Sequence, residues 1–166
     1  MLSFRPLERS DLPFLLEVRN DCRAMLHDDR AISLEDATAW FDATKPRFFV
    51  IVQDDRPVGY FRTSNWDDQN GTVSIGCDIH RAYLGKGLAR AAYPLFLDHL
   101  YNDLGMAKVS LEVLDHNEPA KKLYEALGFV TVGVKRGAVW RDGRPVDSIV
   151  MSLSKADFAA SQAGER

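Results

Sequence analysis

The chain has 166 residues, of which 46% are hydrophobic and 27% are charged. This length suits one domain of ordinary size, and the composition allows a buried core without disulfides or a structural metal. The formal net charge is −3, and acidic and basic residues are mixed along the chain, which argues against a protein that binds nucleic acid through a basic stripe. Two cysteines are too few for a disulfide framework or a zinc cluster, so we expect reduced thiols.

The first residues, MLSFRPLERSDLPF, lack the apolar stretch of a secretion signal. No window approaches the roughly 20 apolar residues of a membrane span. We therefore expect a cytoplasmic protein that contacts neither membrane nor nucleic acid. Residues 1–160 are expected to form a single domain, and residues 161–166, SQAGER, a flexible tail.

Hydrophobic periodicity and turn residues predict the elements in chain order. The first part is expected to hold a strand at 2–6, a helix capped by Ser10 and Asp11, a second helix opened by Ser33, and paired strands at 47–53 and 57–66. The second part is expected to hold a strand at 71–80, a helix at about 87–104, a strand at 107–114, a helix at 117–127 and a hairpin of 129–140 with 144–153. This order predicts an α/β fold with a mixed, mostly antiparallel central sheet, helices on both faces and a parallel crossover at 71–114.

The stretch RAYLGKGLARAAYPLFL, residues 81–97, places a glycine-rich turn between a strand and a long helix. Both common nucleotide motifs fail, because no Ser or Thr follows Lys86 and Arg90 stands where a third glycine is needed. The turn still suits an anion, since the first N–H groups of a helix have no partner within it and carry the positive end of its dipole. The alternative is a tight turn that binds nothing.

The same segment resembles the pyrophosphate loop of the GNAT superfamily of N-acetyltransferases, whose pattern is Gln/Arg-x-x-Gly-x-Gly/Ala. Gly87 and Ala89 match its small positions, while Leu84 stands where Gln or Arg is usual. The resemblance implies acetyl-CoA as cosubstrate, held mostly by main-chain N–H groups and without a metal. The residues expected to hold it here are Asp78, Ile79, Leu84, Gly85, Lys86, Gly87, Leu88 and Ala89.

A second block, LEVLDHNEPAKKLYEALGFVTVG at residues 111–133, resembles the family's strand–helix signature LEVxxxNxxAxxLYxxxGF. The resemblance implies that Asn117 contacts the pantetheine arm of the cofactor. It also implies that Tyr124 lies near the cofactor sulfur and protonates the departing thiolate. The alternatives are a plain helix N-cap for Asn117 and a half-buried core tyrosine for Tyr124.

Glu112 lies in the apolar strand predicted at 107–114, where an unpaired buried carboxylate would be costly. Resemblance to the branch that acetylates ribosomal-protein alanine implies that Glu112 is a general base with a raised pKa, acting on the acceptor amine directly or through water. The alternative for Glu112 is an ion pair with an arginine. Asp78, His80 and His116 are rival candidates for the base.

The acceptor amine is the least determined part of the prediction. The C-terminal segment resembles the branch that acetylates protein N-termini and shares much with spermidine acetyltransferases, whereas EVRND at 17–21 resembles acetyltransferases of nucleotide-linked amino sugars. We therefore expect acetyl transfer to a protein N-terminus or a small amine. Acetylation of a nucleotide-linked sugar and a non-catalytic acetyl-CoA-binding domain are the alternatives.

The candidate acceptor contacts are Arg19, Asn20, Trp66, Arg136 and Trp140. Aromatic side chains beside arginines would suit a nucleotide base and its phosphates, whereas a polyamine would call for an acidic pocket. The chain is expected to be a monomer or a homodimer.

Overall fold

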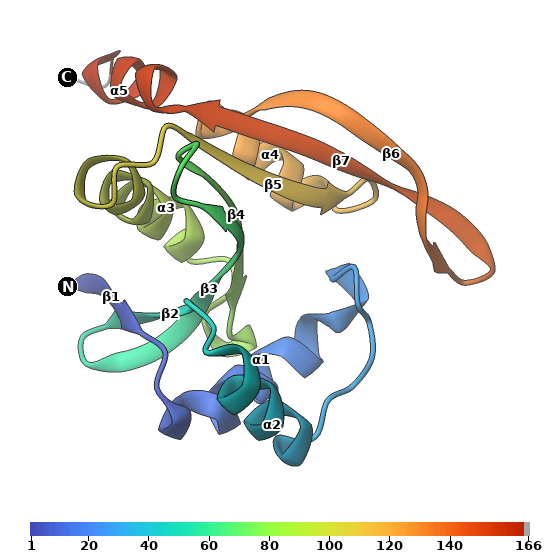
Figure 1. The fold of residues 1–166 in the computed structure, drawn as a ribbon. Helices are drawn as coiled ribbons and strands as arrows, with labels where there is room; N and C mark the ends of the chain where they lie inside the picture. Colours follow the sequence, from blue (N-terminus) through green and yellow to red (C-terminus); the bar gives the residue numbers. More distant parts are fainter. Residues whose placement is uncertain (165–166) are drawn as a thin grey trace. The chain divides into compact units, whose positions relative to one another are not determined.

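The computed structural model describes residues 1–164 of the chain. Seven strands form one sheet in the order β1-β2-β3-β4-β5-β7-β6 (Figure 1). The strands are β1 (Leu2–Pro6), β2 (Phe49–Gln53), β3 (Arg56–Asp67), β4 (Thr72–Ile79), β5 (Lys108–Leu114), β6 (Val130–Arg141) and β7 (Arg144–Ser154). β4 and β5 pair in parallel through Thr72–Ser74 and Lys108–Ser110, whereas β1 with β2, β2 with β3, β5 with β7 and β6 with β7 pair antiparallel. The mixed, mostly antiparallel fold class is therefore confirmed.

Helices were predicted in four of the five segments that form them, with a later end for the third, whereas the helix at Lys155–Gly164 was not predicted. The helices are α1 (Leu12–Cys22), α2 (Leu34–Thr44), α3 (Leu88–Asp98), α4 (Glu118–Ala126) and α5 (Lys155–Gly164), with 3-10 turns at Arg9–Asp11, Arg23–Met25 and Arg81–Tyr83. The helix expected to reach residue 104 changes after Asp98 into a π-helical turn, in which the Leu104 N–H donates to the His99 carbonyl, 3.0 Å away.

The expected tail forms the end of a helix. Residues 161–164 belong to α5, while 165–166 lie outside the described residues. Phe158 of α5 is buried, and its ring lies 5.3 Å from that of Tyr101, measured between centroids. This burial stabilises a helix that the polar end of the sequence did not predict.

The chain divides into two compact units, which are described separately. The first consists of Met1–Ser64 with Gly76–Leu95, and the second of Asn65–Ile75 with the chain from Phe96 onward. That residues 1–160 behave as a single domain stays a prediction. No helix within residues 1–164 is long and apolar enough to cross a membrane.

In the first unit, apolar side chains from α1, β2 and β3 form a core that includes Leu12, Val18, Val50 and Tyr60. Local signals set the boundaries of the elements around it. The Ser33 hydroxyl accepts a hydrogen bond from the Asp36 N–H, 3.1 Å away, and so caps α2 as its sequence predicts.

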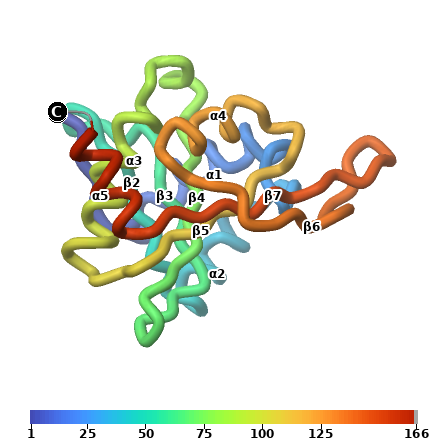
Figure 2. Tube along the Cα trace, turned by 90° about the horizontal axis from the view of Figure 1, so that it is seen from above, coloured from blue at the N-terminus to red at the C-terminus, as the bar shows by residue number. Residues whose placement is uncertain are grey.

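In the second unit, the predicted hairpin of the last two strands is confirmed, and Asp142 and Gly143 in its turn have φ values of +52° and +73°. The β6–β7 hairpin extends past the end of β5 in both views (Figures 1 and 2). Gly128 follows α4 with a φ of +100°, the left-handed conformation expected after a helix. The glycine and Asp-Gly signals are therefore local and reliable in this chain.

Candidate active site

The glycine loop between β4 and α3 has empty space beside its backbone. Gly85 and Gly87 have φ values of +74° and +71°, which glycine adopts without the strain that other residues would meet. A Cβ atom added at either position would meet no heavy atom within 4 Å, so the space beside both residues is empty. The Gly87 carbonyl accepts from the Ala91 N–H, 3.1 Å away, so the N–H groups of the first turn of α3 have no partner within the helix. The loop therefore fits a small anion at a helix N-terminus.

The two large side chains of this loop face solvent. Leu84, which stands where the related loops carry Gln or Arg, is 62% exposed. Lys86 is also exposed, and its Nζ lies 5.6 Å from the centroid of the Tyr83 ring. Any anion held by this loop would therefore be held chiefly by the backbone.

His80 ties the loop to α1. Its Nδ1 accepts from the Ala82 N–H at 3.0 Å, so in the neutral ring the proton is on Nε2, which lies 2.9 Å from Glu17 Oε1. This hydrogen bond lowers the pKa of Glu17. The imidazole also stacks on Phe14, with 5.9 Å between ring centroids. Both ring nitrogens are thus engaged, which weakens the case for His80 as a base.

Asp78, near the end of β4, is held by an arginine. Its carboxylate receives the Arg62 Nε at 2.8 Å and an Nη at 3.4 Å, and the Asp78 side chain is only 7% exposed. The guanidinium of Arg62 lies over Gly76, where an added Cβ would come within 2.5 Å of it. Any side chain at Gly76 would therefore disturb this pair. Contact of Asp78 or Ile79 with a cofactor stays a prediction.

Glu112 of β5 lies in a polar group on the second unit. It forms an ion pair with Lys135 Nζ of β6 and accepts from the Ser148 hydroxyl of β7 at 3.2 Å. Lys135 pairs with Ser148 across the strands, and Glu112 pairs with Val150, two residues from Ser148, so the three polar side chains share one face. The side chain of Glu112 is 35% exposed. The carboxylate is therefore neither unpaired nor deeply buried, and Lys135 and Ser148 are among its partners.

Asn117 and Tyr124 lie on α4, also in the second unit. The Asn117 Oδ1 accepts from the Ala120 N–H at 3.4 Å, so its role as the helix N-cap is confirmed. Tyr124 is 7% exposed, and its ring centroid lies 6.0 Å from that of Phe129. The tyrosine is buried rather than half-buried. Contacts of either residue with a cofactor stay predictions.

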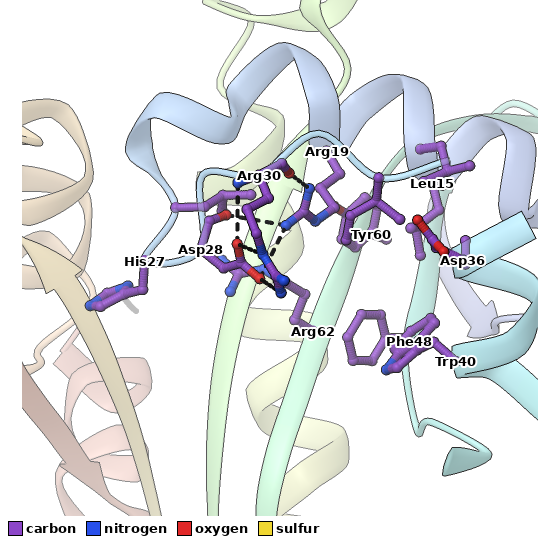
Figure 3. A pocket seen from close by; sticks show the side chains of 14 residues that line it. Leu15, Arg19, His27, Asp28, Arg30, Asp36, Trp40, Phe48, Tyr60 and Arg62 are labelled. Carbon is purple, nitrogen blue, oxygen red and sulfur yellow. Dashed lines mark hydrogen bonds and ion pairs between the residues drawn. The ribbon is translucent and has the colours of Figure 1, made fainter. Parts of the chain in front are cut away.

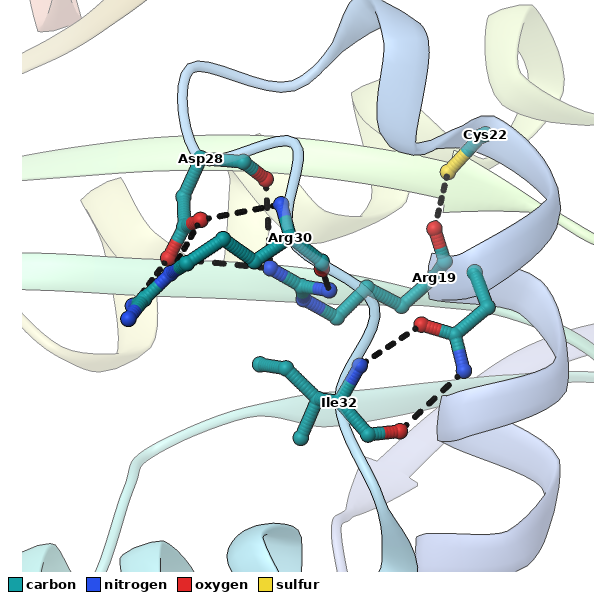
Figure 4. Close-up of polar contacts among 6 residues, drawn as sticks. Arg19, Cys22, Asp28, Arg30 and Ile32 are labelled. Atoms are coloured by element: carbon teal, nitrogen blue, oxygen red, sulfur yellow. Dashed lines mark hydrogen bonds and ion pairs between the residues drawn. The ribbon is translucent and has the colours of Figure 1, made fainter.

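Arg19 and Asn20 hold a neighbouring segment to α1 (Figure 4). The Asn20 amide donates to the Ile32 carbonyl and accepts from the Ile32 N–H, both at 3.2 Å. Arg19 donates to the carbonyls of Asp28 and Arg30. Their hydrogen-bonding groups thus fix residues 26–32, a role that the sequence prediction of acceptor contacts missed.

The other acceptor candidates lie in the second unit. Arg136 donates to Asp147 at 3.1 Å, and its side chain is 84% exposed. Trp140, near the hairpin turn, is 66% exposed, and Trp66 is half-buried near the end of β3. Their part in acceptor binding stays a prediction.

A cavity of about 520 Å³ lies within the first unit (Figure 3). It is lined by residues of α1, residues 26–32, α2 and the start of β2 with β3, and Arg19 is among them. Neither Trp40 nor Arg30 is among the acceptor contacts expected from the sequence, although both line this cavity. Nothing in the sequence relates an aromatic residue on α2 to an arginine in a loop, because only the fold brings the two side chains together.

Within residues 1–164, no group of three or more His, Cys, Asp or Glu side chains is arranged to hold a metal ion. Cys22 and Cys77 are free thiols, and burial raises the pKa of Cys22 to about 12. The Cys22 side chain is therefore a neutral thiol at physiological pH.

A family model described as an acetyltransferase (GNAT) domain matches residues 1–130. The chain therefore belongs to the GNAT acetyltransferase family, as its two motifs suggested.

Individual relatives agree with this assignment. The SPbeta prophage-derived uncharacterized N-acetyltransferase YokL of Bacillus subtilis (strain 168) is 30% identical over 112 residues, which are 68% of this chain and 63% of the relative. This chain thus spans less than two thirds of that relative's length. The spermidine N(1)-acetyltransferase of Escherichia coli (strain K12) is 25% identical over 165 residues, or 96% of this chain and 89% of the relative.

The fold is also found among solved structures. A spermidine N-acetyltransferase from Vibrio cholerae, crystallised in complex with CoA and spermine, matches with a TM-score of 0.88 and 24% identity. The match covers 95% of this chain and 98% of that one. At this identity the likeness shows a shared fold.

Proposed function

We propose that this chain transfers the acetyl group of acetyl-CoA to a primary amine. The observation that carries the proposal is the glycine loop, where two left-handed glycines with empty space beside them precede the N-terminus of α3. A pyrophosphate bound there would accept hydrogen bonds from main-chain N–H groups and meet the positive end of the helix dipole. Lys86, exposed in the same loop, adds a positive charge near the phosphates.

Glu112 is the proposed general base. An ammonium group has no lone pair, so the acceptor must lose a proton before its nitrogen can attack the thioester carbonyl. Glu112 accepts that proton directly or through one water, and the partly exposed carboxylate can reach either. The hydroxyl of Ser148 and the ammonium of Lys135 hold the carboxylate in one orientation, which makes them positioning residues.

A main-chain N–H at the end of β4, near Ile79, is proposed to donate to the carbonyl oxygen as negative charge develops on it. Backbone donors suit this role because a strand end fixes their direction before the reaction begins. Together with Glu112, this donor accounts for the step in which the carbon–nitrogen bond forms.

Tyr124 is the proposed general acid, which gives its phenolic proton to the thiolate of CoA as it leaves. Its burial keeps water from competing for that proton. Tyr124→Phe removes only the hydroxyl, so we expect kcat for CoA release to fall about 10²-fold while the unfolding midpoint in urea changes little. Equal kcat values in the two proteins would remove Tyr124 from the chemistry.

The acceptor is proposed to be a small primary amine. The names of the Escherichia coli and Vibrio cholerae relatives state that they acetylate spermidine, which supports a small amine for this chain. A protein N-terminus and a nucleotide-linked amino sugar stay predictions from the sequence.

The loop assignment is tested by Gly87→Ala. The added methyl group enters the empty space beside the loop, and the positive φ strains the backbone, so we expect KM for acetyl-CoA to rise at least tenfold in an assay of CoA thiol release. Gly105→Ala is the matched control, because Gly105 has a φ of +73° and similarly empty surroundings but lies before β5. It should cost about 1 kcal/mol of stability and leave KM unchanged. An unchanged KM for Gly87→Ala, or an equal rise in both variants, would refute the assignment.

A further inference from the structure

The cavity of the first unit has arginines along one part of its wall and aromatic side chains along another (Figure 3). At one end lie the arginines of α1 and residues 26–32, and at the other lie the aromatic side chains of α2, of β3 and of residue 48 just before β2, with Asp36. Its volume of about 520 Å³ falls in the range of small-molecule sites. The composition of these walls therefore bears on which ligand the cavity can accept.

The arginine end carries an excess of positive charge. Arg30 binds the Asp28 carboxylate through two hydrogen bonds, of 2.9 Å and 2.8 Å. These bonds lower the pKa of Asp28, which keeps its carboxylate ionised. Arg19 lies 3.8 Å from the same carboxylate, and its side chain is only 13% exposed. Two guanidinium groups thus share one carboxylate, and one positive charge is left over.

The other charged groups of the wall are Arg62 and Asp36. The hydrogen bond to Asp28 is the largest, and the Asp36 carboxylate the smallest, of the causes that raise the pKa of Arg30. Arg62 is paired with Asp78, so that pair is neutral as a whole. Asp36 lies in the first turn of α2, where the helix dipole already stabilises a negative charge. A ligand that carries only positive charges would therefore meet the arginines at one end of the cavity. At the other end it would meet Asp36, whose negative charge is already partly balanced by the helix dipole.

The other wall is aromatic. The rings of Phe48 and Tyr60 are nearly parallel, with 6.2 Å between centroids and an angle of 11°, and Trp40 meets Phe48 at 5.2 Å. Trp40 is only half-buried although it packs against the core cluster. Such a wall favours a flat or apolar group on the ligand.

The cavity is joined to the glycine loop through residues of the same unit. Arg62 lines the cavity and binds Asp78, two residues before His80. His80 in turn begins the loop and binds Glu17 of α1, the helix that supplies Arg19. Two contacts, Arg62 with Asp78 and His80 with Glu17, thus link the cavity wall to the proposed pyrophosphate site.

We propose that the cavity binds the acceptor, and that the acceptor is an amine with a carboxylate or phosphate group joined to a flat or apolar body, rather than a polyamine. Arg30 and Arg19 bind the anionic group, and Trp40, Phe48 and Tyr60 contact the apolar body. The identification of the ligand as the acceptor rests on the proposed acetyl transfer, whereas the binding itself does not.

Calorimetric titration of the full chain, with no acetyl-CoA present, tests the preference for an anion. Phenylalanine is compared with phenylalaninamide, and pyridoxamine 5′-phosphate with pyridoxamine, because each pair keeps the amine and the ring and differs in the anionic group. Spermidine is the polyamine probe. We expect the anionic member of at least one pair to bind about tenfold more tightly than its partner, and spermidine to bind more weakly than that member. The pair in which the anionic member binds more tightly shows whether the cavity recognises a carboxylate or a phosphate.

Arg30→Gln locates the preference in the cavity. Its side chain is 79% exposed, so the substitution should leave the fold intact, and the tenfold preference should disappear. Arg9→Gln is the matched control, since Arg9 is also an exposed arginine paired with an aspartate, Asp42, but it does not line the cavity. Arg9→Gln should keep the preference.

The proposal is overturned if neither anionic probe gains over its neutral partner, if no probe binds, if spermidine binds most tightly, or if both arginine variants behave alike. The same amines are then offered with acetyl-CoA. Anion-dependent binding without CoA release would retain the cavity assignment and refute the transfer. Release of CoA with spermidine, without any anion preference, would refute the cavity assignment and retain the transfer.

Discussion

Asp78 and Glu112 are both carboxylates on sheet strands beside a basic side chain, yet their settings differ. Asp78 is 7% exposed and is bound by the guanidinium of Arg62. Glu112 is 35% exposed and is bound by Lys135 and the hydroxyl of Ser148. A guanidinium remains charged at any pH that a protein tolerates and binds a carboxylate in a fixed geometry, whereas a lysine is a mobile point charge.

The difference bears on which of the two carboxylates we propose as the base. Asp78 is nearly closed to solvent, and its oxygens face Arg62 rather than an incoming amine. Glu112 is partly exposed, so its carboxylate is open to an acceptor amine or to a water. The comparison therefore favours Glu112 over Asp78 as the base.

The largest expected effect is that of Glu112→Gln on turnover. The amide keeps the shape of the side chain and can still accept from Ser148, but it cannot take a proton from the acceptor. We expect kcat for CoA release to fall by about 10²–10⁴-fold. Glu118→Gln removes a more exposed, lysine-paired carboxylate on α4 and should change kcat less than twofold. Equal rates for Glu112→Gln and the unmodified chain would place the base elsewhere.

Asp78→Asn should act on stability. Removing the charge leaves Arg62 without its partner, and since the Arg62 side chain is 40% exposed we expect a loss of about 2 kcal/mol in urea unfolding. Replacing Arg62 as well, with Met, should recover part of the loss, because no charge is then left unpaired. A kcat for Asp78→Asn as low as that of Glu112→Gln, with normal stability, would reverse the comparison.

A third carboxylate, Asp11, is also bound by an arginine, and we expect its removal to have a smaller effect on stability. It is buried and bound by Arg5 at 2.7 Å and 2.9 Å, and these hydrogen bonds lower its pKa below the usual 3.8. A lowered folded-state pKa adds stability above the unfolded-state pKa, and that stability is lost as the pH falls through the folded-state value.

We therefore expect Asp11→Asn to cost about 1 kcal/mol near neutral pH, a modest value because the Arg5 side chain is 41% exposed. The difference from the unmodified chain should shrink once the pH falls below about 4. Urea unfolding at a series of pH values measures it. A difference that stays constant with pH would show that the charge of Asp11 contributes nothing.

The glycine loop and the two turns were predictable because their causes are local. Gly85 and Gly87 form the turn expected between a strand and a helix, Gly128 adopts a left-handed conformation after α4, and Asp142 with Gly143 forms the turn of the predicted hairpin. The π-helical turn after α3 and the whole of α5 were missed. The end of α5 is polar in sequence, and its helix depends on the burial of Phe158.

The sequence by itself determined the family, the order of the elements, and the residue types of a glycine loop and a strand–helix motif. These are properties of neighbouring residues and regular spacing. Only the tertiary structure decided which charges meet. In the folded chain, Glu112 pairs with a lysine and Asp78 pairs with an arginine. Arg19 and Asn20 form hydrogen bonds that hold residues 26–32. The tertiary structure also gathered the arginines and aromatics of the cavity, because pairing between distant segments depends on strand register and helix packing, which no single stretch of sequence specifies.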